Sequence, residues 1–256
     1  MLKDDFQTVL ASYRKFLGNI GDKLSPLRLE SHVESLKDWS QTGDLSAVRM
    51  WFEEQQSKCT MTITDIRLED CNGWTIDPDT GWFKHSSGEF FYVQGIRVGV
   101  SSSREVENGW DQPIITQAGY NGGLLGIIRK NIDDVPHYLI QAKAEPGNPD
   151  KVQISPCLQA TFSNLKQAHG GRKPKLSEFF ESPAANGANI LFDQWMSEDG
   201  GRLHLKRNKG MLAQIADVKE LDLDESFRWI SLFQIKQLIS ENSWINPHVR
   251  GIISHL

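Results

Sequence analysis

Apolar residues at the start of the chain recur every three to four positions, which predicts amphipathic helices. Across residues 1–18 these apolar positions are Phe6, Val9, Leu10, Tyr13, Phe16 and Leu17. Residues 26–41 repeat the spacing behind Ser25-Pro26, a frequent helix start, and residues 45–56 predict a third helix. Residues 230–240, and the segment that Asn246-Pro247 opens, return to helical spacing at the end of the chain.

Between these helices the pattern changes to the period of two that is typical of β-strands. Threonines alternate with Met61 and Ile63 over residues 60–64, which predicts a strand there. After a turn-rich passage over residues 70–88, residues 90–100 are rich in β-branched and aromatic side chains, and Gly95 within them predicts a bulge. Further strands are predicted over residues 114–117, 124–129, 138–143, 157–162, 190–196, 202–206 and 211–218.

Helices at both ends and a run of strands between them predict a mixed α/β or α+β fold. The chain has 256 residues, which is enough for a substantial core, and a net charge of −5. We find no internal repeat and no low-complexity segment. We therefore expect a helical N-terminal extension over residues 1–44 and one domain over residues 45–256.

Several classes of protein are disfavoured by what the sequence lacks. There is no run of eighteen apolar residues, and the N-terminus lacks the apolar core of a signal peptide, so we expect a cytoplasmic protein with no membrane partner. Cys59, Cys71 and Cys157 are odd in number and show no C-x-x-C spacing, which argues against a disulfide framework or a structural zinc site. The charge is mildly negative without blocks of one sign, so no nucleic-acid partner is indicated.

Polar side chains that do not suit a core gather over residues 138–164. Two strand-like pieces, residues 138–143 and 157–162, flank a turn built from Glu145-Pro146-Gly147-Asn148-Pro149. The polar positions are Gln141, Lys143, Glu145, Asn148, Gln159, Thr161 and Asn164. So many hydrogen-bonding groups beside a carboxylate indicate the floor of a binding site, although a solvated hairpin has the same composition.

Two segments near the predicted strand at residues 90–100 also carry candidate chemistry. Arg104 and Glu105, followed by Trp110 and Gln112, would suit a phosphate and a ring, and a surface ion pair beside a packed tryptophan would explain them as well. His85 lies in a polar turn directly before this strand. A histidine there would serve as acid or base, unless it is only solvated.

A charged turn within residues 194–209 is the third candidate, because Arg202, Arg207 and Lys209 would face an anionic ligand or simply belong to a solvated hairpin. The familiar catalytic motifs are missing. Neither G-x-S-x-G, G-x-G-x-x-G, a Walker sequence nor H-E-x-x-H occurs. From the residues alone, the chain is a mixed α/β protein with a polar, partly basic pocket.

A series of short motifs runs from about residue 45 to the C-terminus. In order, they are Gly73-Trp74, His85-x-x-Gly88-x-Phe90-Phe91, Gly95-Ile96-Arg97-Val98, Arg104-Glu105-Val106, Trp110-x-Gln112-Pro113, Ala142-Lys143-x-Glu145-Pro146-Gly147-Asn148, Ser155-Pro156, Gln159-Ala160-Thr161-x-Ser163-Asn164, Ser197-Glu198-x-Gly200 and Arg207-Asn208. The ordered series resembles the NDP-hexose 2,3-dehydratases, which are enzymes of deoxysugar biosynthesis.

This resemblance implies a Nudix-like fold, a mixed β-sheet flanked by helices. It implies a lyase that needs no cofactor and no metal, with a nucleotide-linked 4-keto-6-deoxyhexose as substrate, most often a dTDP-sugar such as dTDP-4-keto-6-deoxyglucose. Family members lack the metal-binding Nudix box, and this chain agrees. When Arg104-Glu105 is aligned with the core of that box, Asn108 and Gly109 stand where two glutamates would be.

The chain departs from the family in one respect. Typical members are tandem duplications of this unit, and this chain holds one copy. The resemblance therefore leads us to expect a homodimer that restores the two-repeat arrangement by symmetry.

The implied reaction removes the C3 proton, which the neighbouring C4 carbonyl makes acidic, and then expels the C2 hydroxyl with help from an acid. The product is a 3,4-diketo-2,6-dideoxy sugar. We assign Glu145 as the base, since a carboxylate in a Pro-Gly turn at a strand end can be oriented and partly desolvated. We assign His85 as the acid, with Glu105 and Glu198 as alternates.

The remaining polar candidates are expected to bind the substrate. Cationic side chains would hold the diphosphate: Arg97, Arg104, Lys143 and Arg202. Trp110 would stack on the nucleotide base. Side chains that would read hydroxyls and the pyrimidine edge are Gln112, Gln159, Thr161, Asn164 and Asn208.

Two rival functions stay open at this point. The chain would also suit a non-catalytic nucleotide-sugar-binding subunit that keeps the pocket. Alternatively, it would be a Nudix-like sugar-nucleotide hydrolase or isomerase with altered chemistry. The missing carboxylates of the box disfavour the hydrolase.

Overall fold

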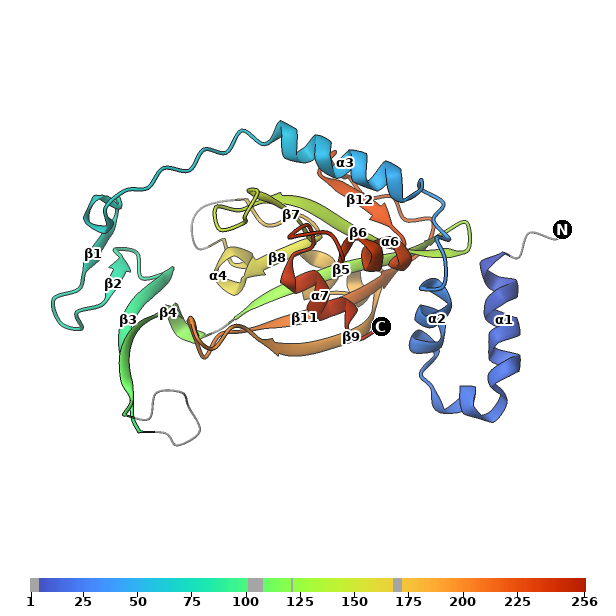
Figure 1. The fold of residues 1–256 in the computed structure, drawn as a ribbon, viewed down its shortest axis with the longest axis horizontal. Coiled ribbons are helices and arrows are strands. Elements are labelled where there is room, and N and C mark those ends of the chain that lie inside the picture. Colours follow the sequence, from blue (N-terminus) through green and yellow to red (C-terminus); the bar gives the residue numbers. More distant parts are fainter. Residues whose placement is uncertain (1–4, 101–107, 121, 168–171) are drawn as a thin grey trace.

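The computed structural model describes residues 5–100, 108–120, 122–167 and 172–256 (Figure 1). A large mixed sheet with helices forms the body; a smaller sheet lies at one end of the long axis, and two N-terminal helices lie at the other. The mixed α+β class predicted from the sequence is confirmed. No helix within these ranges is long and apolar enough to cross a membrane.

The two N-terminal helices are α1 (Phe6–Leu17) and α2 (Pro26–Glu34), joined by the 3₁₀ turn η1 (Gly18–Lys23). Asp5 and Ser25 cap them, each accepting a hydrogen bond from a backbone N–H of the first turn. Their apolar faces meet in a small cluster that includes Trp39 and, from the body, Val135. The predicted N-terminal helices are thus confirmed, and they pack on the body through this cluster.

Helix α2 ends seven residues before the predicted residue 41. The chain turns at Ser35, and the buried indole of Trp39 donates a hydrogen bond to the carbonyl oxygen of Val33 at 2.8 Å. The apolar spacing extends past the helix because Trp39 packs back against it from a loop.

The large sheet has the strand order β12, β6, β5, β11, β9, while β7 pairs with β6 and β8 with β5. The bounds are β5 (Gly123–Ile132), β6 (Val135–Ala144), β7 (Val152–Pro156), β8 (Leu158–Thr161), β9 (Ala188–Ser197), β11 (Arg207–Ile215) and β12 (Phe227–Ile230). Strands β5 and β11 are parallel and the other pairs antiparallel. Strand β6 pairs with the end of β5, and β8 with its beginning. Strands β5 and β6 therefore diverge, and β7 and β8 fill the space between them.

Both faces of this sheet are buried. Ile127 and Ile128 are adjacent on β5 and fully buried, yet they belong to different core clusters, because successive side chains of a strand point to opposite faces. One cluster lies under α3 (Leu45–Lys58), α6 (Leu232–Leu238) and α7 (Pro247–Ile253), and the other under α5 (Glu178–Glu181). The remaining short elements are α4 (Phe162–Leu165), η3 (Ala118–Tyr120) and η4 (Ala184–Asn186).

The small sheet has the order β1, β2, β3, β4, β10, with β10 parallel to β4. Its strands are β1 (Trp74–Ile76), β2 (Phe83–His85), β3 (Phe91–Val98), β4 (Trp110–Gln117) and β10 (Leu203–His204), and η2 (Leu68–Asp70) precedes them. The β1–β2 hairpin lies in the passage for which only turns were predicted. Strands β3 and β4 pair without a register shift, so the bulge predicted at Gly95 is wrong.

The strand predicted over residues 60–64 is also wrong. The segment after α3 runs as an extended connection to η2 and has no strand partner (Figure 1). Ile63 and Ile66 are more than half exposed. Alternation favours a strand only where a neighbouring strand offers backbone hydrogen bonds, and none lies beside this segment in the described structure.

The polar segment over residues 138–164 is built differently from a solvated hairpin. Strand β7, which was not predicted, pairs with β6 across the turn, where Glu145 N donates to Lys151 O at 2.9 Å. Strand β8 pairs with β5 instead of β6. All of β7 is buried, so the segment contributes core as well as polar surface.

Candidate functional site

A cavity of about 350 Å³ lies where the ends of four strands of the large sheet meet helix α7. Its lining comes from both sheets and from α7: Phe91, Leu125, Lys143, Glu145, Gln159, Ala160, Thr161, Asn164, Glu198, Leu203, Lys206, Asn208 and His248. Seven of these side chains were predicted from the sequence as catalytic or substrate-binding: Lys143, Glu145, Gln159, Thr161, Asn164, Glu198 and Asn208. Unlike the hollows near the N-terminal helices, on the small sheet and beside η4, this cavity adds an imidazole to its carboxylates and ammonium groups.

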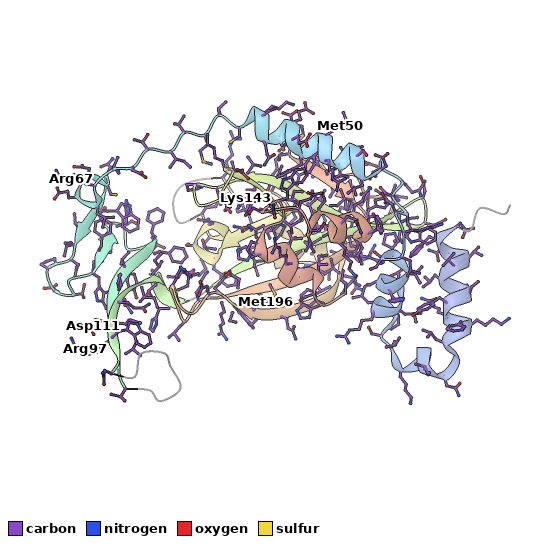
Figure 2. The ribbon with its side chains drawn as sticks, in the orientation of Figure 1. Met50, Arg67, Arg97, Asp111, Lys143 and Met196 are labelled. Atoms are coloured by element: carbon purple, nitrogen blue, oxygen red, sulfur yellow. The ribbon has the colours of Figure 1, made fainter. Side chains whose placement is uncertain are left out.

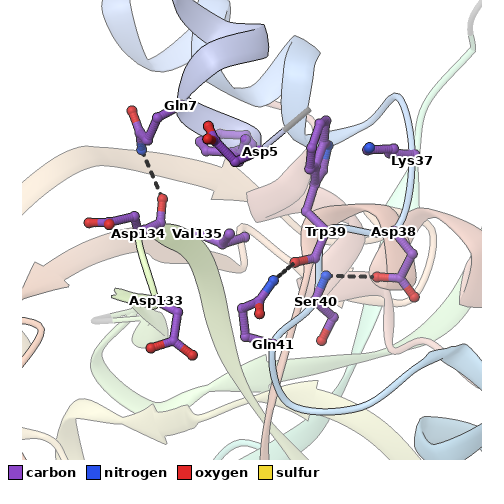
Figure 3. Close-up of a pocket in the computed structure, with 11 residues that line it drawn as sticks. Asp5, Gln7, Lys37, Asp38, Trp39, Ser40, Gln41, Asp133, Asp134 and Val135 are labelled. Atoms are coloured by element: carbon purple, nitrogen blue, oxygen red, sulfur yellow. Dashed lines mark hydrogen bonds between the residues drawn. The ribbon is translucent and has the colours of Figure 1, made fainter. Parts of the chain in front are cut away.

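Two of the larger hollows have linings without a histidine. One, of about 660 Å³, separates the N-terminal helices from the β5–β6 turn; there Gln7 Nε2 donates to Asp134 O at 2.8 Å (Figure 3). Its side chains hold α1 and the loop after α2 to the body. The other, of about 810 Å³, lies on the small sheet and is mainly apolar. We therefore place the candidate active site in the smaller cavity.

One wall of the cavity is a carboxylate held by two neighbours. Glu145 follows β6, and its Oε1 accepts from Gln159 Nε2 at 2.9 Å and lies 3.4 Å from Lys143 Nζ. Lys143 Nζ also donates to the carbonyl oxygen of Gln159 at 3.4 Å. The carboxylate is about one-third exposed, so it stays accessible from the cavity while its direction is fixed.

The opposite wall is a chain of polar side chains from the β9–β11 hairpin. Asn208 Nδ2 donates to Glu198 Oε1, and Lys206 Nζ donates to Asn208 Oδ1 at 2.9 Å and to Gln117 Oε1. Burial lowers the pKa of Lys206, and the charge of Glu198 opposes that effect. The ammonium also lies over the ring of Phe91, 5.4 Å from its centre, so this cation is held in place on several sides.

His248 closes the cavity from helix α7. Its Nδ1 is 3.6 Å from Glu198 Oε1, and its side chain is about one-fifth exposed. Burial lowers the pKa of the imidazole, which Glu198 and Glu145 raise and Lys143 and Lys206 lower. The ring is thus in electrostatic contact with both walls.

Strand β8 and helix α4 supply the neutral polar groups. Gln159 and Thr161 are two residues apart on β8 and face the cavity, while Ala160 between them belongs to the core. Thr161 Oγ1 caps α4 by accepting from Asn164 N at 3.2 Å. Among the described residues, Gln159 Oε1 is buried without a hydrogen-bond donor, which makes it an acceptor that a ligand can use.

His85, the predicted acid, does not line this cavity. It ends β2 in the small sheet, where its ring lies edge-on to those of Phe90 and Trp74, and its Nδ1 is 2.8 Å from Ser87 Oγ. The polar turn that suggested catalysis is the connection between β2 and β3. The structure therefore separates His85 from Glu145.

Four predicted binding residues also lie away from the cavity. Arg97 makes a bidentate ion pair with Asp111, both bonds 2.9 Å long, on the small sheet, whereas Lys143 lies in the body (Figure 2). Trp110 Nε1 donates to Gln112 Oε1 at 2.6 Å, and Gln112 Nε2 donates to Gly201 O at 2.9 Å.

Arg202 is the fourth, and it donates to Asp199 Oδ2 at 2.6 Å at an exposed position. Both arginines are largely exposed ion pairs, which contribute little to stability. Arg104 and Glu105 lie outside the described residues.

Two chemically important residues of the cavity, Lys206 and His248, were not predicted as site residues. Lys206 lies in the charged turn that the sequence indicated, but Arg202 and Arg207 were among the residues predicted there to face an anionic ligand. His248 follows the Asn246-Pro247 helix start, and no local pattern links it to Glu198, fifty residues away. Only the packing of α7 beside the β9–β11 hairpin brings these two side chains together.

Taken together, the cavity offers two carboxylates, two ammonium groups and an imidazole among neutral hydrogen-bonding groups. Such a set can remove a proton, stabilise an oxyanion and protonate a leaving group. Within the described ranges, no group of three or more His, Cys, Asp or Glu side chains is placed to hold a metal ion.

Comparison with known proteins gives the family. The NDP-hexose 2,3-dehydratase family model matches residues 45–256. A "dTDP-4-dehydro-6-deoxy-alpha-D-glucopyranose 2,3-dehydratase" of Amycolatopsis orientalis is 37% identical over 216 residues, which cover 82% of this chain and 44% of that protein. A protein of the same name from Streptomyces violaceoruber is 35% identical, covering 83% of this chain and 46% of that one. The chain thus spans about half the length of the curated relatives it matches.

Similar solved structures include a Nudix hydrolase from M. smegmatis, with 14% identity and a TM-score of 0.32 over 58% of this chain and 88% of that one. At that TM-score the Nudix-like fold stays a prediction. The assignment to a family is based on the sequence matches instead. The family model covers both walls of the cavity, from Lys143 to His248. The chain belongs to the NDP-hexose 2,3-dehydratase family.

Proposed function

We propose that this chain is a nucleotide-sugar 2,3-dehydratase, a hydro-lyase that acts on a dTDP-linked 4-keto-6-deoxyhexose. The observation that carries the proposal is the joint placement of Glu145, Lys143, Glu198 and Lys206 on one cavity in a chain of this family. The names of the relatives support the dTDP-sugar as substrate.

The first chemical step in this proposal is removal of the C3 proton by Glu145. Its carboxylate is aimed by Gln159 and Lys143, so it can meet one face of a bound sugar. The electrons of the C–H bond move toward the C4 carbonyl and give an enolate. Lys206 suits the developing oxyanion, because two of its three N–H donors already hold it in place and the third can point at the ligand.

The second step expels the C2 hydroxyl as water and leaves a C2–C3 double bond beside the C4 carbonyl. The resulting enol becomes the 3,4-diketo-2,6-dideoxy sugar by moving a proton from the C3 hydroxyl to C2. Gln159, Thr161, Asn164 and Asn208 would hold the sugar hydroxyls, and Lys143 would face the diphosphate.

The test is incubation with dTDP-4-keto-6-deoxyglucose and a trapping reductant, with the product followed by mass spectrometry. We expect loss of one water, unchanged by EDTA. Glu145→Gln should lower the rate by about 10²–10⁴-fold, since that is the usual contribution of a general base. Glu220→Gln, at an exposed position away from the cavity, is the matched control and should behave as wild type.

Three other outcomes would contradict the proposal. Release of a nucleoside monophosphate would indicate a hydrolase. Intact substrate that nevertheless raises the melting temperature would indicate a binding subunit. An unimpaired Glu145→Gln variant would remove the base from the mechanism while leaving the reaction in place.

We further propose that the chain works as a homodimer. An apolar surface on and beside the small sheet supports this. Leu68 and Ile76 line the 810 Å³ hollow, Ile63 and Ile66 lie in the segment that leads to η2, and all four are more than half exposed. Such a patch is typical of a contact surface. A second copy is the occupant we propose, because this chain spans about half the length of the relatives it matches and two copies would equal that length.

We also propose a cytoplasmic location. The support is that all three cysteines are free and that Cys59 and Cys71 are partly accessible, which suits a reducing compartment. Immunodetection of the tagged protein in fractionated cells would test this, and recovery outside the cytoplasmic fraction would contradict it.

A further inference from the structure

The side chain of His248 is positioned by the start of helix α7. Asn246 caps the helix, and its Oδ1 accepts a hydrogen bond from His248 N at 2.8 Å, while Pro247 fixes the first turn. Val249, Ile252 and Ile253 anchor the helix in the core. The imidazole therefore reaches the cavity from a rigid element, as a catalytic group requires.

A carboxylate orients the ring from behind. Glu198 Oε1 lies 3.6 Å from His248 Nδ1, and Asn208 Nδ2 donates to the same oxygen. A carboxylate beside Nδ1 favours the form that is protonated there and leaves Nε2 as the nitrogen that meets a ligand. Within the described residues, Nε2 has no hydrogen-bond partner from the protein.

The reaction under "Proposed function" needs a proton donor at the C2 oxygen, because hydroxide is a poor leaving group. His85, predicted for this task, lies on the small sheet and not on the cavity. We propose that His248 is the catalytic acid of this dehydration, donating the Nε2 proton to the departing C2 hydroxyl, with Glu198 as its positioning residue. This inference rests on the proposed function.

The step balances in protons and electrons. Glu145 takes the C3 proton, and the C–H electron pair becomes the enolate. The enolate electrons then form the C2–C3 double bond and reform the C4 carbonyl as the C2–O bond breaks. That oxygen keeps the bonding pair, takes the proton of His248 and leaves as water. Glu145 afterwards loses its proton to solvent, and His248 takes one up.

The charges around the ring allow this cycle. Glu198 and Glu145 favour the imidazolium, whereas burial, Lys143 and Lys206 disfavour it. A nucleotide diphosphate carries negative charge that would counter the two ammonium groups. Substrate binding therefore favours the protonated ring, and loss of product favours the neutral one.

A substrate with a different leaving group isolates the acid. In the 2-deoxy-2-fluoro analogue of the 4-keto sugar nucleotide, fluoride leaves in place of hydroxide and needs little protonation. For His248→Gln we expect loss of water from the natural substrate to slow by about 10²–10⁴-fold, and fluoride release from the analogue to slow by less than about tenfold. Glu145→Gln should slow both water loss from the natural substrate and fluoride release from the analogue.

Further readouts separate chemistry from folding. His248→Gln should keep the wild-type exchange of the C3 proton with deuterated water, which depends on Glu145. His255→Gln is the matched control, because its ring stacks on Phe192, 4.4 Å between centres, and does not line the cavity. Glu198→Gln should slow water loss and, like His248→Gln, spare fluoride release.

Two results would overturn the inference without touching the proposed function. One is a His248→Gln variant that dehydrates the natural substrate at the wild-type rate. The other is a His248→Gln variant in which water loss and fluoride release slow by the same factor while the melting temperature stays that of wild type. That result would make His248 a binding residue. A wild-type protein that releases neither water nor fluoride would overturn the proposed function, and this inference with it.

Discussion

We expect the charge of the His248 imidazole to decide the pH dependence of the proposed reaction. Burial, the largest influence, holds the pKa of the free protein's ring below its ordinary value of 6.5. A catalytic acid must be protonated, so kcat/KM should fall as pH rises through this lowered pKa. In the complex the anionic substrate favours the proton, so kcat should fall at a higher pH than kcat/KM.

Both profiles, measured from about pH 5 to about pH 9, check this, because kcat/KM reports the free protein and kcat the complex. The falling limb should disappear in His248→Gln and should be weak with the fluoro analogue. A His248→Gln profile identical in shape to that of wild type would show that another group titrates.

At the same scale, the predicted and observed sites show what sequence can reveal. Lys143, Glu145, Gln159, Thr161 and Asn164 lie within one short segment, so a local polar cluster was enough to find them. Their common cavity forms because the chain pairs with β6 as β7 and then directly with β5 as β8.

His248 and Lys206 could not be found in that way, because their partners are supplied by packing between distant elements. The prediction of His85 as the acid was wrong for the converse reason. Its local surroundings looked catalytic, but the small sheet carries it away from the body.

At the scale of elements, strand β5 depends on a glycine for its contact with helix α5. A Cβ atom on Gly126 would overlap the ring of the buried Phe180. Gly126→Ala should therefore lower the free energy of unfolding by about 1–3 kcal/mol, the usual cost of overpacking. Urea unfolding would measure this.

Gly95→Ala is the control for that substitution. Gly95 is also in a strand, but nothing lies within 4 Å of the position of its Cβ. The two variants should differ clearly in unfolding midpoint. Equal midpoints would mean that α5 yields to the extra methyl group at little cost.

Helix α2 is tied to the large sheet by a buried carboxylate. Glu34 accepts from Tyr138 Oη at 2.8 Å and lies 3.3 Å from Arg129 Nη2, which also bonds Glu30 at 2.5 Å. Burial raises the pKa of Glu34 to about 7, against the opposing charge of Arg129. The nearby carboxylate of Glu30, which shares the same guanidinium, also raises the pKa of Glu34.

Because the folded protein keeps this proton to a higher pH than the unfolded chain, the free energy of unfolding should fall as pH rises from about 4.5 to about 7. Glu34→Gln should remove that slope, while the exposed Glu53→Gln should keep it. Urea unfolding at several pH values in this window checks the difference between variants, in which other titrating groups cancel. A slope unchanged by Glu34→Gln would contradict the raised pKa.

Fold and site were predictable to different degrees at this scale. The strands β5, β6 and β11 carry long apolar runs because both faces of the large sheet are buried, and these were predicted. Strands β1 and β2 are three residues each and none of their side chains is fully buried, so their pattern resembles that of turns. The pairing of strands creates the cavity, and it cannot be predicted from the pattern of any single segment.

At the scale of the whole molecule, the cavity and the exposed apolar surface lie on different parts of the fold. The cavity joins the body to the small sheet through Phe91 and Leu203, whereas the apolar hollow lies around β1 and η2. A dimer formed through that hollow would leave the walls of the cavity intact while restraining the small sheet. Association and catalysis would then be coupled through the position of Phe91.

The proposed dimer predicts that charge on this surface gives monomers. Light scattering after size exclusion, over a range of dilutions, should give twice the chain mass for wild type and one chain mass for Leu68→Glu or Ile76→Glu. Both side chains are about 70% exposed, so their melting temperatures should stay near that of wild type. Val218→Glu is the control, since Val218 is 89% exposed and does not line the hollow, and it should leave the dimer intact. A wild-type monomer at all concentrations would contradict the dimer, and a dimer that survives both substitutions would place its interface elsewhere.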